Sequence, residues 1–189
     1  MKGEISEIID GSLDAVVTIR DLMPEIEAAG KIMIDSLKQG NKVMSCGNGG
    51  SSLQAQHFTG EIVGKFEKEK RALAGLCLNT DVGNMTAVGN DYGYELIFKR
   101  QIEGLGKNGD VLVCFTTSGN SKNLIEAVKD IKGIKVINLL GRDGGKMKGT
   151  GDVDIIINSN NTARIQECHL LILHIFAKLI EDAFLDIKK

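Results

Sequence analysis

The chain has 189 residues and a mass of 20.4 kDa, and 42% of its residues are hydrophobic and 25% charged. This mix is typical of one globular domain with a substantial core. The formal charge of -2 and the pI near 5.9 exclude a general attraction to nucleic acid or to anionic lipid, so any anion site must be built locally.

The first ten residues are polar and acidic, unlike a secretory signal peptide. The apolar stretches are far shorter than the ~20 residues that span a bilayer. Four cysteines lie far apart without a CxxC spacing, a pattern typical of buried, reduced thiols. We therefore expect a cytoplasmic protein that binds neither membrane nor nucleic acid.

Residues 3–39 are expected to form two helices, broken either near Gly11 or at residues 21–24. Ile32, Met33 and Leu37 give the second helix an apolar face before Gly40. Residues 1–40 are assigned to the same domain as the rest of the chain. Packing of these helices on the sheet and packing on another subunit are both open.

After Gly40, short apolar runs alternate with helical segments. The runs at 42–46, 72–78, 111–115, 135–140 and 153–157 predict buried strands, and the segments at 51–66, 91–105, 121–131 and 162–186 predict helices. This alternation predicts an α/β fold in which a five-stranded, mostly parallel sheet is sandwiched between helices. Ligands of such sheets bind at the carboxyl ends of the strands.

Two loops at that edge suit an anionic ligand. GNGGSS, at 47–52, follows the first strand and opens a helix, where glycines allow close approach and free N–H groups attract an anion. TTSGNS, at 116–121, stands in the same context and presents the hydroxyls of Thr116, Thr117, Ser118 and Ser121. The alternatives are a tight turn for the first loop and helix capping by Ser118 or Ser121 for the second.

Two helical segments carry groups able to bind a metal or to transfer protons. His57 and Glu61 are four residues apart and share one helix face, and a plain surface pair is the alternative. Gln166 and His174 lie on the last helix in apolar surroundings, where a buried structural histidine is the alternative. Eight helical residues rise about 12 Å, so one metal can meet both only across a subunit boundary or at a distorted helix start.

The segment NDYGYE, at 90–95, places Asn90 and Asp91 in a glycine-flanked loop after the second strand. Asp91 is expected either to cap a helix or to accept hydrogen bonds from substrate hydroxyls. The sequence leaves both roles open.

In combination, CGNGGSSLQAQHFTGEIVGKF, NTDVGNMTAVGNDYGYE, TTSGNS and TARIQECHLLILH resemble the motifs of the phosphoheptose isomerases, which carry a sugar isomerase (SIS) domain. The resemblance runs from about residue 42 to residue 181. It implies an SIS domain over residues 41–189, which is a three-layer α/β/α sandwich of flavodoxin-like topology. It also implies a homotetramer with active sites shared between subunits, and one zinc ion per subunit. The implied reaction converts sedoheptulose 7-phosphate into D-glycero-D-manno-heptose 7-phosphate, a precursor of activated heptose.

The resemblance also assigns roles to residues. It implies that the metal ligands are His57, Glu61, Gln166 and His174, and that Glu61 and His174 transfer protons through an enediol. The implied substrate contacts are Asn48, Gly49, Gly50, Glu61, Asn90, Asp91, Thr116, Thr117, Ser118, Ser121 and Gln166. Lys65 stands where the family often has Arg, and residues 51–54 depart from the family's usual small-residue run.

Two other functions are compatible with this resemblance. One is binding of the bacterial replication initiator by a non-catalytic SIS protein. That relative has Asn where this chain has His174 and Arg where this chain has Ser118. The other is an isomerase of a different phosphosugar or a phosphosugar sensor, which the departures at Lys65 and residues 51–54 would permit.

Overall fold

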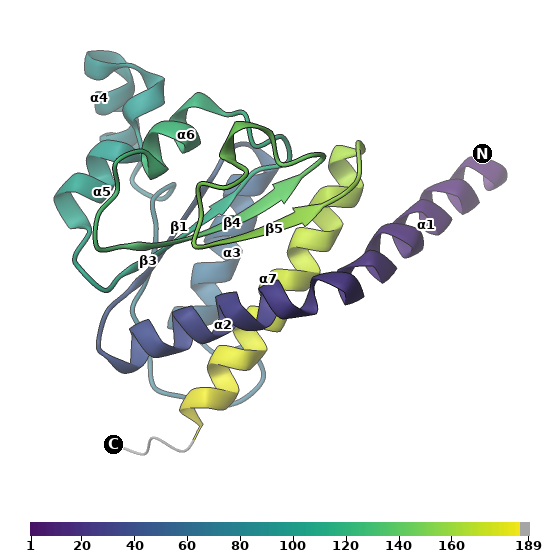
Figure 1. Ribbon diagram of the computed structural model, residues 1–189, viewed down its shortest axis with the longest axis horizontal. Helices are drawn as coiled ribbons and strands as arrows, with labels where there is room; N and C mark the ends of the chain where they lie inside the picture. The colour runs from purple at the N-terminus through teal and green to yellow at the C-terminus, as the bar shows by residue number, and fades with distance from the viewer. Residues whose placement is uncertain (186–189) are drawn as a thin grey trace.

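The computed structural model describes residues 1–185 and confirms the predicted α/β architecture (Figure 1). Five strands form the central sheet: β1 (Val43–Gly47), β2 (Gly75–Cys77), β3 (Val111–Phe115), β4 (Lys135–Gly141) and β5 (Val153–Ile157). All neighbouring strands pair in parallel, in the order β2-β1-β3-β4-β5. The strand order therefore reverses between β1 and β3, where open α/β sheets bind their ligands.

The sheet is buried on both faces, as its continuous apolar strands predict. Every residue of β3 is buried, and its side chains alternate between two core clusters. Val111 and Val113 face the cluster formed with α2 (Met23–Lys38), α3 (Gly50–Val63) and α7 (Thr162–Phe184). Leu112 and Cys114 face the cluster formed with α4 (Val82–Tyr92), α5 (Lys99–Leu105) and α6 (Lys122–Val128). The three-layer prediction is thus confirmed.

Two predicted elements between β1 and β3 are wrong in their extent. β2 has three residues rather than the seven predicted at 72–78. The helix predicted at 91–105 is the end of α4, a 3₁₀ turn η2 (Tyr94–Leu96) and α5. Gly93, with φ +98°, separates α4 from η2, a conformation that favours glycine. No helix was predicted from the sequence over residues 82–90, which form most of α4.

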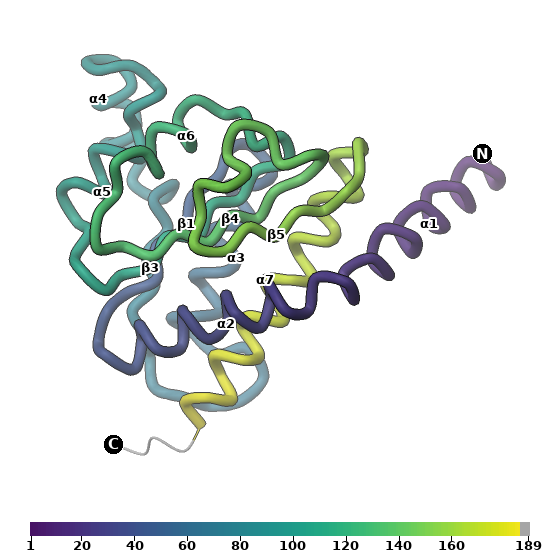
Figure 2. The backbone as a smooth tube through the Cα atoms, viewed as in Figure 1, coloured from purple at the N-terminus to yellow at the C-terminus, as the bar shows by residue number. Residues whose placement is uncertain are grey.

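The N-terminal extension consists of α1 (Lys2–Val17), a 3₁₀ segment η1 (Thr18–Leu22) and α2. The two α-helices are therefore separated at residues 18–22, which overlaps the predicted break at 21–24. The alternative break at Gly11 is wrong because Gly11 is inside α1. α2 contributes buried residues to the core, including Ala29 and Met33. α1 has none, and its tube runs outward from the body of the fold in Figure 2.

The exposed side of α1 is apolar. Its large aliphatic side chains are between 51% and 62% exposed: Ile5, Ile8, Ile9, Leu13 and Val17. None of the helices within residues 1–185 combines the length and apolar character needed to cross a membrane.

The carboxyl edge of the sheet carries both predicted ligand loops. Gly47 of β1 pairs with Phe115 of β3. Asn48 and Thr116 therefore leave the sheet next to one another, at the point where the strand order reverses. A short 3₁₀ turn, η3 (Gly145–Met147), follows β4 at the same edge.

Candidate active site

The first loop, residues 47–50, is held by side-chain amides from two other segments. Asn79 Oδ1 accepts from Gly47 N at 3.1 Å, and Asn79 Nδ2 donates to Gly47 O at 2.9 Å. The side chains of Asn48 and Asn123 exchange two hydrogen bonds of 2.8 Å, which join this loop to α6. Gly49, with φ +54° and ψ -127°, then turns the chain into α3 in a conformation suited to glycine.

The predicted tight turn is therefore present. Binding of a ligand by Asn48, Gly49 and Gly50 stays a prediction.

His57 and Glu61 form a pair on the exposed side of α3. His57 Nε2 lies 3.0 Å from Glu61 Oε1. The His57 side chain is 41% exposed and that of Glu61 is 21% exposed. An exposed pair of this kind contributes little to stability, so a substrate or a neighbouring subunit can reach both groups at small cost.

α7 brings His174 to this pair. The ring centroids of His57 and His174 are 5.0 Å apart, and the ring planes meet at 74°. His174 is half-buried, so the alternative of a fully buried structural histidine does not apply to it. Three of the four side chains assigned to the metal thus meet on adjoining faces of α3 and α7.

Gln166 lies elsewhere along the same pair of helices. A Cβ added to Gly50 would stand 2.6 Å from Gln166 Nε2, and Gln54 Nε2 donates to Gln166 O at 2.6 Å. α7 is continuous over Thr162–Phe184, so no distorted start shortens the rise of about 12 Å between Gln166 and His174. Within one chain, Gln166 therefore contacts the start of α3, and its place among metal ligands stays a prediction.

The donor types of this set fit zinc, which proteins bind through imidazole nitrogen and carboxylate oxygen. His57, Glu61 and His174 supply two imidazoles and one carboxylate, with His57 in contact with both partners. Across residues 1–185, however, no three His, Cys, Asp or Glu side chains are placed to hold a metal together. The 3.0 Å between His57 Nε2 and Glu61 Oε1 is close to the spacing of two donors on one tetrahedral zinc ion, whose bonds are about 2.0–2.2 Å long, so these two groups fit a shared metal.

The second loop, residues 116–121, is folded tightly after β3. Thr116 is buried, and its Oγ1 accepts from Gly119 N at 3.2 Å. Gly119 has φ +61°, and a Cβ added there would stand 1.9 Å from Gly144 O. This loop is therefore locked against the turn that follows β4, and its shape requires glycine at 119.

The hydroxyls of this loop do not cap α6. Ser121 is the residue before the helix, and the helix start has no side-chain capping bond. Ser118 Oγ instead accepts from Asn120 N at 3.2 Å, within the loop. The capping alternative is therefore wrong, and the hydroxyls of Thr117, Ser118 and Ser121 stay candidates for a ligand.

Asn90 and Asp91 lie in the last turn of α4 rather than in the predicted loop. Both are exposed, and Asn90 Nδ2 donates to Asp91 Oδ1 at 2.7 Å. The helix-capping alternative for Asp91 is wrong, because the cap of α4 is Asp81. Tyr94 in the following turn donates from its hydroxyl to Asn48 Oδ1 at 3.2 Å, which connects this segment to the first loop.

Sequence reasoning missed four residues that shape this site: Asn79, Tyr94, Asn123 and Phe66. Asn79 had a usable signal, since it is a polar residue directly after a buried strand. The others have partners far away in the sequence. The Phe66 ring, for example, lies 5.6 Å from the His174 ring at an interplanar angle of 30°.

Two buried groups of α7 lie behind the site, in the core. Burial raises the pKa of the Cys168 thiol to about 11. Burial also lowers the pKa of His169 to about 4, although its Nε2 lies 3.1 Å from the carbonyl oxygen of Leu140. Both side chains are therefore uncharged packing groups, as expected for Cys168.

Comparison with known proteins identifies the family of this chain. Residues 11–141 match the SIS domain family. The chain is 44% identical over 185 residues to a phosphoheptose isomerase of Aliarcobacter butzleri, covering 96% of this chain and 98% of the relative. A phosphoheptose isomerase of Nitratiruptor sp. is 48% identical over 166 residues, covering 87% of this chain and 89% of the relative.

Solved structures show the same relationship. The structure of a phosphoheptose isomerase from Francisella tularensis matches with a TM-score of 0.91 at 39% identity, over 95% of this chain and 97% of that one. The phosphoheptose isomerase of Neisseria gonorrhoeae matches with a TM-score of 0.89 at 39% identity, over 96% and 98%. The chain belongs to the phosphoheptose isomerase family of SIS-domain proteins.

Proposed function

We propose that the chain isomerises sedoheptulose 7-phosphate to D-glycero-D-manno-heptose 7-phosphate, a precursor of nucleotide-activated heptose. One observation carries the proposal: the His57–Glu61 pair on α3 meets His174 on α7. An acid–base pair and a phosphate loop at the reversal of strand order are what this reaction needs. Family membership at 44% identity supports the choice of reaction.

Isomerisation of a ketose to an aldose moves a proton from C1 to C2 through a cis-enediol. Glu61 and His174 are the proposed pair: one removes the C1 proton and the other delivers a proton at C2. The two groups flank His57, so a sugar lying across α3 and α7 can reach both. The partial exposure of Glu61 leaves its oxygens open to the substrate.

The phosphate ester is proposed to bind in the loop at 116–121. The Thr117 and Ser118 hydroxyls are half-exposed and Ser121 stands at the start of α6 without capping it. Hydroxyl and backbone N–H donors bind phosphate through charge-assisted hydrogen bonds. The tight packing of Gly119 against Gly144 keeps these donors in place before the substrate arrives.

His57, Glu61 and His174, together with Gln166, are proposed to hold one zinc ion per subunit. When bound, such an ion polarises substrate oxygens as a Lewis acid. The proposal is supported by the donor types of the set. Its test is retention of zinc by the purified chain, measured by elemental analysis, and loss of that zinc in His57→Ala.

We also propose a cytoplasmic homotetramer with active sites shared between subunits. The apolar side of α1 and a hollow of about 580 Å³ between α2 and α7, lined by Ile19, Met23, Leu171 and Ile175 among others, supply apolar surface that a partner subunit would bury. The openness of His57 supports a site that a second subunit closes. The same arrangement would let Gln166 of one subunit approach the acid–base pair of another.

Incubation of the purified chain with sedoheptulose 7-phosphate tests the function directly. We expect an aldose 7-phosphate to form, and chelator to lower the rate if zinc takes part. The enzyme proposal fails if there is no turnover with or without added zinc while the oligomer stays intact and binds the phosphosugar tightly. The chain would then be a phosphosugar sensor.

A further inference from the structure

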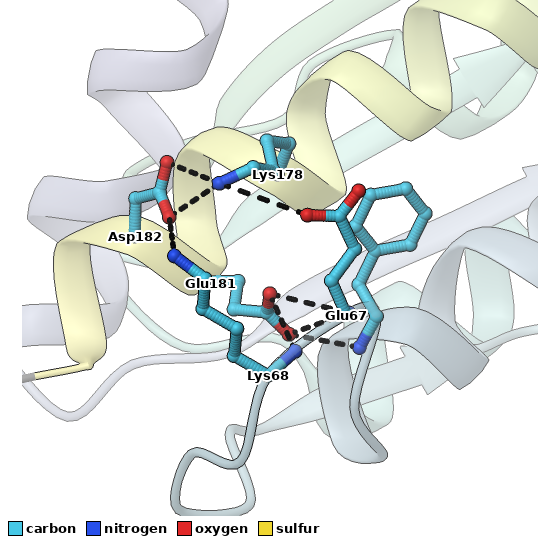
Figure 3. A network of polar contacts seen from close by, with 6 residues as sticks. Glu67, Lys68, Lys178, Glu181 and Asp182 are labelled. Atoms are coloured by element: carbon cyan, nitrogen blue, oxygen red, sulfur yellow. Dashed lines mark hydrogen bonds and ion pairs between the residues drawn. The ribbon is translucent and has the colours of Figure 1, made fainter.

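The loop after α3, residues 64–71, is fastened to α7 by one buried carboxylate. Glu181 Oε2 accepts from Phe66 N at 2.9 Å and from Glu67 N at 3.0 Å, and Glu181 Oε1 accepts from Lys68 N at 2.9 Å. Figure 3 shows the carboxylate reaching from the helix to the loop backbone. We call these three contacts the Glu181 clip.

The Glu181 clip is charged and withdrawn from water. Glu181 has 0% exposure. Burial raises the pKa of its carboxyl, but the N–H bonds from the loop outweigh burial and hold the pKa below its ordinary value. A buried charge is costly unless its hydrogen bonds are satisfied. Here three backbone donors satisfy it, so the loop has one preferred position on α7.

The other end of the loop is fastened to α3. Lys70 Nζ donates to Ile62 O at 2.7 Å and to Gly64 O at 2.5 Å, at the carboxyl end of that helix. Around the clip, the surface pairs of Lys178 with Asp182 and Glu67 (Figure 3) are exposed contacts, which contribute little. The loop therefore bridges the two helices that carry the proposed acid–base groups.

The clip also fixes where the Phe66 ring lies. Phe66 donates its N–H to Glu181 and places its ring 5.6 Å from the ring of His174. His174 and Glu181 are seven residues apart, about two helical turns, and so lie on the same side of α7. The His174 imidazole and the Glu181 carboxylate are therefore carried by the same helix, α7. The loop that Glu181 binds places the Phe66 ring next to the His174 ring.

We propose that Glu181 is a positioning residue: through the loop backbone it holds Phe66 against His174 and so keeps the imidazole oriented for proton transfer. This inference rests on the proposed role of His174. It predicts that a change at Glu181, two turns away from the acid–base pair, alters the orientation of the His174 ring.

The test uses Glu181→Gln, which keeps the shape and removes the charge, and Phe66→Leu, which keeps the clip and removes the ring. Selectively labelled histidine gives three ring resonances, from His57, His169 and His174. In Phe66→Leu the His174 resonance loses the ring-current shift of Phe66. In Glu181→Gln it moves in the same direction, whereas the core His169 resonance stays in place.

Kinetics with sedoheptulose 7-phosphate provide the second readout. A small misplacement of a catalytic group slows the reaction strongly, so we expect kcat to fall roughly tenfold to a hundredfold in both variants. KM should change little, because neither substitution alters the phosphate loop. The matched control is Ile180→Ala, which truncates a fully buried core neighbour of Glu181 and keeps the Glu181 carboxylate and the Phe66 ring. It should lower the melting temperature and leave kcat and the His174 resonance unchanged.

An unshifted His174 resonance in Glu181→Gln would overturn the inference. Equal loss of kcat in Ile180→Ala and Glu181→Gln would also overturn it, because Glu181 would then act only through stability. If the wild-type chain does not turn over sedoheptulose 7-phosphate, the proposed function fails, and the resonance comparison still decides whether Glu181 positions Phe66.

Discussion

Replacing His169 by Gln separates the packing of this core side chain from its titration. His169 is fully buried, its Nε2 contacts Leu140 O, and its ring lies against that of Phe115 at 6.3 Å. Its Nδ1 has no hydrogen-bond partner among the described residues. Protonation would place a charge and an unsatisfied N–H in the core, and this is why burial lowers the pKa. A Gln amide nitrogen can still donate to Leu140 O but cannot titrate in this range.

The size of the effect follows from the pKa, which falls from 6.5 to about 4 on folding. Between these values the unfolded chain binds a proton at His169 that the folded chain does not. Stability contributed by the neutral ring is therefore present above pH 6.5 and is lost as the pH falls toward 4. From pH 7 to pH 5 the loss is about 2 kcal/mol.

The assay is urea unfolding of wild type and His169→Gln at pH 7 and pH 5. Protein concentration is held fixed, because the stability of an oligomer depends on it. Other titrating groups affect both proteins alike, so the wild type should lose about 2 kcal/mol more than the variant between the two pH values. Equal losses would refute the assignment of His169 as a neutral buried group.

Three glycine and serine substitutions test the two loops. Ser118→Ala should raise KM by about 5-fold to 150-fold with little change in kcat, because a hydrogen bond worth about 1–3 kcal/mol is lost. An unchanged KM would place the phosphate elsewhere. In Gly119→Ala, a residue at positive φ gains a Cβ that collides with Gly144 O. We expect the melting temperature, measured by circular dichroism, to fall by several degrees. An unchanged melting temperature would contradict the close contact between the two loops. Gly50→Ala displaces the Gln166 side chain and should lower kcat while the protein stays folded. A wild-type kcat would show that Gln166 takes no part in the active site.

The sequence predicts the sheet well because its strands are local apolar runs. β3 and β5 begin and end where the runs at 111–115 and 153–157 begin and end. The missed helix, α4, contains two glycines and two asparagines, which have low helix propensity. Its start depends on Asp81, whose side chain accepts from Asn84 N at 2.9 Å. A pattern of apolar spacing does not register such a cap.

The site divides in the same way between local and distant contacts. The His57–Glu61 pair follows from helical spacing and was predicted from it. The contact of His57 with His174 depends on the packing of α3 on α7, and only the resemblance to a family indicated it. The contact of Glu181 with the loop backbone could not be predicted from the sequence. Every residue except proline carries a backbone N–H group, so the identity of residues 66–68 does not reveal such an acceptor.

The central claim is that Glu61 and His174, on two different helices, form one acid–base pair. Its most direct test is turnover of sedoheptulose 7-phosphate by Glu61→Gln and His174→Asn, with substrate binding measured separately by calorimetry. We expect kcat to fall by about 10²–10⁴-fold in each variant, while the dissociation constant for the phosphosugar changes little. Near-wild-type kcat in either variant would contradict the claim.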